Sequence, residues 1–170
     1  MRDVRTEAGR DGAAGHGGAP DGQAAGFTLI EMMIVVAIVA TLAALAIPPL
    51  HKAIEEARVA RAIGDLRALQ ADIVGYEAGG GTLPASLAAV GRGGMDDPWG
   101  NPYQYLRIEG SQSGNGMLRK DRFLVPLNSD FDLYSMGPDG RSRPPLTARA
   151  SQDDIVRAND GAFIGLASRY

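Results

Sequence analysis

The chain has 170 residues, 17 Lys and Arg against 20 Asp and Glu, a formal net charge of −3, and no cysteine. This length predicts one globular domain with attached segments, and the lack of cysteine excludes a disulfide-held scaffold and a cysteine nucleophile. The slightly acidic charge balance offers no basic surface for nucleic acid. His16 and His51 are the only histidines, so we expect no Ser-His-Asp triad, no histidine-rich metal site and no enzymatic activity.

The first 26 residues are rich in Gly, Ala and Asp and show no apolar periodicity. Such a composition cannot bury enough apolar surface to fold, so we expect this segment to be disordered.

An apolar run follows, from Met32 to Leu50, with no charged residue and with Thr41 as its only polar side chain. It is close to the roughly 20 residues that a helix needs to cross a membrane. Glu31 lies just inside this segment, where an unpaired buried charge costs several kcal/mol. An acidic side chain in such a place indicates a functional role and predicts a cationic partner.

The stretch Gly26-Phe27-Thr28-Leu29-Ile30-Glu31 resembles the cleavage and methylation signature of type IV pilins and of type II secretion pseudopilins. The resemblance implies that a prepilin peptidase cleaves after Gly26 and that the new N-terminal Phe27 is N-methylated. It also implies that Glu31 pairs with the N-terminal amine of the next subunit. The expected location is the bacterial inner membrane, crossed once, with the globular domain in the periplasm.

Two other interpretations of the apolar run stay open. One is a plain membrane anchor, which leaves Glu31 unexplained. The other is a secretory signal peptide, because Ala44-Leu45-Ala46 has the small-residue pattern of a cleavage site. The charge inside the apolar region and the lack of a Lys or Arg cluster before it speak against a signal peptide.

One long helix is expected over residues 27–78, with 27–50 in the membrane or in a filament core. Pro48-Pro49 predicts a kink or a melted turn, because proline removes a helical hydrogen bond. Alternatively, the helix ends there and a second begins near Lys52. Beyond the prolines, apolar residues at spacings of three and four predict a face that packs on a core: Ile63, Leu66, Leu69, Ile73 and Tyr76.

Gly79-Gly80-Gly81 predicts the end of this helix and the start of a globular domain over residues 79–170. A hairpin signal, Asn159-Asp160-Gly161, lies between two short apolar stretches near the C-terminus. Apolar and β-branched stretches predict an antiparallel sheet laid across the helix. The expected elements are a short helix over 84–90, strands over 103–108, 122–127 and 131–136, and the hairpin over 155–164.

Two further stretches resemble the major pseudopilin of type II secretion systems. The first, Asp97-Pro98-Trp99-Gly100-Asn101-Pro102-Tyr103, is a turn, and we expect a structural role for it. The second begins at Asp132 and ends at Ile155, and in that family the loop binds calcium. The resemblance implies as ligands the Met136 carbonyl and the side chains of three residues, Asp139, Asp153 and Asp154; the carbonyls of Arg141 and Ser151 are weaker candidates.

Spacing alone leaves this loop open between a calcium site and an ordinary solvated turn. Calcium takes six to eight oxygen ligands, whereas three carboxylates that converge without metal repel one another. Residues 141–152 form a longer loop than is usual in the family and contain Pro144-Pro145. The insertion either bulges outward and keeps the site or displaces it.

The sequence therefore predicts an α+β, pilin-like fold: a long N-terminal membrane-spanning helix packed on a small antiparallel sheet with a C-terminal calcium loop. The predicted function is that of a major pseudopilin, which polymerises through its N-terminal helix into a periplasmic filament that drives type II secretion. Expected partners are further copies of the chain, minor pseudopilins, prepilin peptidase, the inner-membrane assembly platform and, before assembly, membrane lipid. The alternatives are a type IV pilus subunit and a secreted, calcium-stabilised binding domain.

Overall fold

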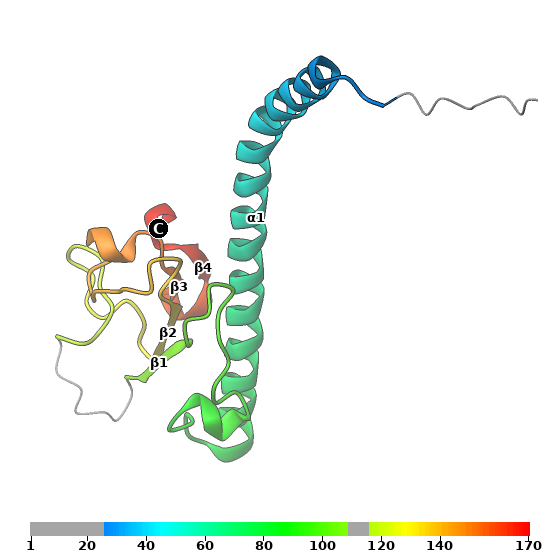
Figure 1. Ribbon diagram of the computed structural model, residues 1–170. Coiled ribbons are helices and arrows are strands. Elements are labelled where there is room, and N and C mark those ends of the chain that lie inside the picture. Colours follow the sequence, from blue (N-terminus) through cyan, green and yellow to red (C-terminus); the bar gives the residue numbers. More distant parts are fainter. Residues whose placement is uncertain (1–25, 109–115) are drawn as a thin grey trace, which may run out of the picture. The chain divides into compact units, whose positions relative to one another are not determined.

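The structure is a computed structural model that describes residues 26–108 and 116–170. Disorder was predicted for the first 26 residues, and all of them except Gly26 lie outside the described residues. The chain divides into two compact units, Met1–Ala43 and Ala44–Tyr170, which are described separately below. Figure 1 shows the order of the elements along the chain.

Helix α1 spans Leu29–Gly80. At its start the Glu31 backbone N–H donates to Thr28 Oγ1 at 3.2 Å, a hydrogen bond that satisfies one of the free amides of the first turn. At its end Gly81 takes a positive φ of 71°, which only glycine adopts without steric cost. Pro48 and Pro49 lie inside the helix, which neither ends nor unwinds there. The melted turn and the separate second helix were therefore wrong, and the kink stays a prediction.

The first unit contains the N-terminal part of α1, and its described side chains are almost all solvent-exposed. Large apolar side chains such as Leu29, Met33 and Val36 are more than half exposed. Among the described residues, α1 is the one helix long and apolar enough to cross a membrane. An apolar helix with no intramolecular cover fits a lipid or helix-bundle environment better than water.

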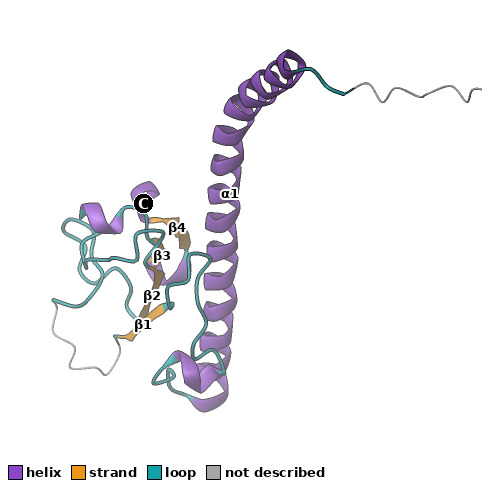
Figure 2. Cartoon of the chain, viewed as in Figure 1, coloured by secondary structure: helices purple, strands orange, loops and turns teal. Residues whose placement is uncertain are grey.

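The second unit contains a four-stranded antiparallel sheet in the order β1-β2-β3-β4. Figure 2 shows these strands between α1 and the loop-rich side of the domain. Their bounds are β1 Gln104–Arg107, β2 Phe131–Ser135, β3 Ile155–Ala158 and β4 Phe163–Leu166. The described part of the domain also contains short 3-10 helices: η1 Leu87–Val90, η2 Arg149–Ser151, η3 Asn159–Gly161 and η4 Ala167–Arg169.

One predicted element was wrong and another was wrong in part. Residues 122–127 form no strand, because the backbones of Asp121 and Leu124 bond to each other across a tight turn inside that stretch. The expected helix over residues 84–90 is only the 3-10 turn η1. The predicted hairpin is confirmed, with η3 joining β3 to β4.

The main core lies between α1 and the sheet. Leu66, Leu69 and Ile73 are fully buried, as the helical spacing predicted, and Ile63 is partly buried. Tyr76 is 43% exposed, so its assignment to the core was wrong, while Ala62 is buried and was missed. The helix meets residues from the sheet and the preceding loops: Leu83, Leu87, Tyr103, Phe131, Leu133 and Ile155.

A second apolar cluster covers the other side of the sheet. Along β3, Ile155 belongs to the main core, whereas Val156 and Ala158 belong to this second cluster. Neighbouring side chains of a strand point to opposite faces, so β3 separates the two clusters. The cluster also contains Leu127, Leu146 and Ala167, and it anchors the long loop that was predicted to bind calcium.

Candidate functional site: the N-terminal signature and the acidic loop

The N-terminal signature is solvent-exposed. Phe27 is 75% exposed and Glu31 is exposed as well. Within the described part of the chain, the Glu31 side chain has no ion-pair partner. An apolar segment that carries one acid without an internal cation needs a cation from another molecule once it leaves water.

The turn after Pro98 ties three parts of the second unit together. Asp97 Oδ1 accepts from the backbone N–H groups of Trp99 and Asn101, at 3.0 and 2.8 Å, and its Oδ2 accepts from Ser135 Oγ at 2.6 Å. Asn101 Nδ2 donates to the Gly137 carbonyl at 2.8 Å. The turn therefore fixes the end of β2 and the start of the acidic loop, as we call the segment between β2 and β3.

The aromatic residues of the same turn fix it to the helix. Trp99 Nε1 donates to Glu55 Oε2 at 3.0 Å, and this hydrogen bond lowers the pKa of Glu55. Tyr103 Oη donates to Asp65 Oδ2 at 2.9 Å, and burial with this acceptor raises the pKa of Tyr103. These contacts are those of a structural turn.

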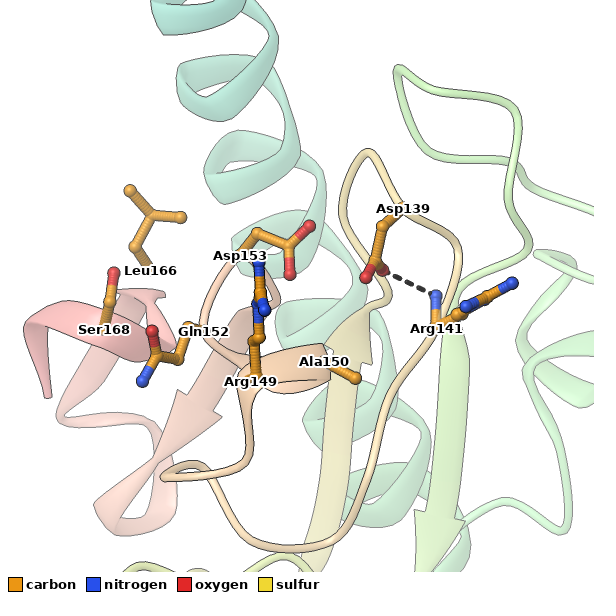
Figure 3. Close-up of a pocket in the computed structure, with 8 residues that line it drawn as sticks. All are labelled: Asp139, Arg141, Arg149, Ala150, Gln152, Asp153, Leu166 and Ser168. Carbon is orange, nitrogen blue, oxygen red and sulfur yellow. Dashed lines mark hydrogen bonds between the residues drawn. The ribbon is translucent and has the colours of Figure 1, made fainter.

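Two of the predicted calcium ligands face one open pocket of about 660 Å³. Figure 3 shows Asp139 on the loop after β2 and Asp153 on the segment before β3, with both carboxylates toward the pocket. Asp139 Oδ1 accepts from the Arg141 backbone N–H at 2.8 Å. Gly137, at a φ of 64°, packs against the Asp153 backbone so closely that a Cβ would lie 2.4 Å from its carbonyl oxygen. The loop thus places these two carboxylates on one pocket, which Arg141 and Arg149 also line.

Asp154 faces elsewhere. Its side chain is fully buried, and its Oδ2 accepts from Arg119 Nη2 at 2.6 Å and from Ser142 Oγ at 2.5 Å. Burial raises the pKa of the Asp154 carboxyl, and the hydrogen bonds from Ser142 and Arg119 oppose only part of this shift. Neither Asp154 nor Met136 lines the pocket, and the described residues contain no group of three or more His, Cys, Asp or Glu that could hold a metal.

Comparison with known proteins gives the family. Residues 22–47 match the prokaryotic N-terminal methylation motif. The chain is 33% identical over 140 residues to the type II secretion system core protein G of Pseudomonas aeruginosa, covering 70% of this chain and 87% of that protein. The chain belongs to the core protein G family, the major pseudopilins of type II secretion.

Other relatives of this pseudopilin include the Escherichia coli core protein G, 29% identical over 152 residues, with 77% of this chain and 88% of that protein covered. The fimbrial protein of Neisseria meningitidis is 33% identical over 140 residues, with 79% of each chain covered. A pilus subunit is the less supported alternative. No solved structure is significantly similar to the chain. Within the described residues, the pseudopilin is membrane-anchored by the apolar part of α1 and carries a globular domain.

The pseudopilin also contains buried cations that the sequence did not reveal. Arg119 Nη1 donates to the Arg143 carbonyl at 2.9 Å and also to Ser142 Oγ. Ser151 Oγ accepts from the Arg143 N–H and donates to its carbonyl, at 2.8 and 2.7 Å. Because Arg119 and Asp154 lie 35 residues apart, no local pattern could have shown that they pair. Together these contacts hold the inserted loop against the domain.

A second buried cation, Arg157, joins the sheet to the helix. Its guanidinium donates to both oxygens of Asp130, each at 2.7 Å, and its Nε donates to Gln70 Oε1 of α1 at 2.9 Å. Burial raises the pKa of Asp130, but the Arg157 hydrogen bonds and the Phe131 N–H outweigh it and hold that pKa below its usual range. The pair orients β2 and β3 on the helix.

Proposed function

We propose that this pseudopilin is the major structural subunit of a periplasmic filament that drives protein export. The similarity to core protein G over most of both chains carries the proposal. The exposed apolar part of α1 supports it, because such a surface needs lipid before assembly and other helices afterwards. Minor pseudopilins and the inner-membrane assembly platform are the remaining partners, and the role is structural rather than catalytic.

Processing comes first in this proposal. Prepilin peptidase cleaves between Gly26 and Phe27, and the new amine of Phe27 is methylated. The amine then meets Glu31 of a neighbouring subunit inside the filament. The unpaired acid in the first turn of α1 supports this arrangement, since a charge-assisted pair offsets its desolvation.

The N-terminus of the membrane-fraction protein tests the processing step. We expect sequencing to begin at Phe27 and the first residue to carry a methyl group, because Gly26-Phe27 lies within residues 22–47, which match the methylation motif. Gly26→Ala should accumulate uncleaved chain in the same membrane fraction. A start at Ile47, after Ala44-Leu45-Ala46, would establish a secretory signal peptide instead.

We also propose that calcium binds in the pocket between Asp139 and Asp153. The two carboxylates come from segments separated by the inserted loop, so a bound cation would join them only in the folded state. Carbonyl oxygens of the loop and water would complete its shell, and the Met136 carbonyl, outside the pocket lining, would join it only if the loop moved. Asp154, as the ion-pair partner of Arg119, reaches the cation only if it leaves that pair.

Calcium should stabilise a soluble fragment running from Lys52 to Tyr170, which contains all the residues of both apolar clusters. A ligand at a hundredfold excess over its Kd stabilises the native state by about 2.7 kcal/mol, which raises Tm by several degrees. Thermal unfolding with calcium and with chelator measures the shift. Asp139→Ala and Asp153→Ala should each abolish it, and magnesium should replace calcium poorly.

Asp96→Ala is the matched control, because Asp96 is an exposed acid that does not line the pocket. It should keep the full calcium shift. Identical melting curves for the unmutated fragment in calcium and in chelator would mean that the acidic loop is only a turn.

A further inference from the structure

An apolar tip projects from the second unit. We call residues 122–125 the apolar knob; its backbone is closed by paired hydrogen bonds between Asp121 and Leu124, at 2.7 and 3.1 Å. Phe123, at the tip, is fully exposed, and Leu124 and Val125 are 48% and 43% exposed. Arg122 takes a φ of 46°, an unfavourable conformation for a residue with a side chain. A clustered apolar tip held in a tight turn marks an interaction site more than a solvent-facing loop.

A complementary hollow lies on the helix side of the same unit. The helix groove, about 480 Å³, has an apolar floor of Val59, Ala60, Ile63 and Leu166. Its rim carries charged side chains: Lys52, Glu55, Glu56 and Arg169. Glu56 is 71% exposed, and its contact with Lys52 is a long one at 3.9 Å, so its carboxylate is open to a further cation.

The knob and the groove border different parts of the C-terminal segment: Arg122 lines a hollow with Ser168 and Tyr170, whereas the groove is lined by Leu166 and Arg169. The knob is continuous with Leu127, which belongs to the cluster on the far side of the sheet, whereas the groove is on α1. Figure 1 shows the yellow-green segment that contains the knob on the side away from α1. No residue of the knob lines the groove of its own chain, and Phe123 stays fully exposed.

We propose that the knob of one copy seats in the helix groove of a neighbouring copy, with Phe123 on the apolar floor and Arg122 paired with Glu56. The proposal rests on the proposed function, because a filament requires a partner of the same chain. A contact between two different surfaces joins copies head to tail. When the rotation from one copy to the next does not form a ring, the contact repeats along a filament. The rim carries Lys52 and Arg169 as well as two glutamates, and Glu55 already accepts from Trp99 and Arg58, so Glu56 is the rim acid that remains for Arg122.

The natural chain has no cysteine, so paired cysteines give a direct test. The full-length chain carrying both Phe123→Cys and Ala60→Cys should form a disulfide ladder of multimers on mild oxidation in membranes. The two single variants, expressed together, should give mixed dimers and no higher species. The combination of Phe123→Cys with Tyr76→Cys is the control, because Tyr76 is exposed on the same helix outside the groove.

A charge exchange tests the same contact without cysteine. Arg122→Glu should lower the yield of sedimentable filament at least tenfold, and adding Glu56→Arg should restore it. Two results would overturn the contact while leaving the proposed function intact. One is that the variant with both cysteines forms filaments but no disulfide-linked multimers, and the other is that Phe123→Cys alone forms dimers. The absence of any filament from the unmutated chain would overturn the proposed function and the contact with it.

Discussion

Glu31→Gln is expected to abolish filament assembly while leaving cleavage at Phe27 intact. The variant keeps the shape and apolar surroundings of α1 but leaves the incoming amine without a counter-charge. Breaking a buried ion pair by removing one partner costs about 3–5 kcal/mol. Because about 1.4 kcal/mol is tenfold in affinity, each subunit contact should weaken by more than 100-fold. Sedimentation and electron microscopy of the membrane fraction measure the loss.

Glu77→Gln serves as the control, since Glu77 lies on the same helix within the globular domain, outside the helix groove. It should assemble normally. The N-terminus of Glu31→Gln should still be Phe27, which separates a defect in assembly from a defect in processing. Normal filaments from Glu31→Gln would show that no intersubunit pair forms at this acid.

The second large effect is expected at the Arg119–Asp154 pair. Arg119 is 3% exposed and Asp154 is 0% exposed, so removing either partner leaves a buried charge uncompensated. Arg119→Met and Asp154→Ala should each destabilise the fragment from Lys52 to Tyr170 by about 3–5 kcal/mol. That is a large part of the roughly 5–15 kcal/mol of a typical domain, and Tm should fall by roughly ten degrees or more.

The double variant Arg119→Met with Asp154→Leu should recover most of this loss, because two apolar side chains need no counter-charge. Urea unfolding of Arg119→Met, of a further single variant Asp154→Leu and of the double variant gives the coupling free energy of the pair. Arg149→Met, at an exposed cation that lines the pocket of Asp139 and Asp153, is the control and should change stability little. The loss of unfolding free energy in each single variant should be the same in chelator as in calcium. If chelator removes the effect of Asp154→Ala, Asp154 acts as a metal ligand and not as the partner of Arg119.

The long helix and its core face were predictable because they depend on local pattern. Leu66, Leu69 and Ile73 recur at helical spacing, and each is fully buried. Gly81 ends the helix for a reason that is visible in the sequence, since glycine accepts a positive φ. Tyr76 continues the same spacing yet is exposed, because which turn of a helix the sheet covers depends on contacts far along the chain.

The loops were predicted less well for the same reason. The stretch after Asp121 has the apolar, β-branched composition of a strand, but its backbone turns back on itself after two residues. Asp154 was grouped with Asp139 and Asp153 because of a family resemblance, whereas its partner Arg119 lies 35 residues earlier. Ser142 and Arg143, inside the inserted loop, complete that network. Pairings between distant segments appear only when the chain is folded.

Removal of the gene from its own bacterium tests the central claim, that this pseudopilin is the major subunit of a secretion filament. Export of secreted proteins into the medium should stop, with those proteins retained in the periplasm, and the unmutated chain should restore it. Surface pili and the adhesion or motility that depends on them should be unchanged. Normal export together with the loss of surface pili would contradict the account and make the chain a type IV pilus subunit.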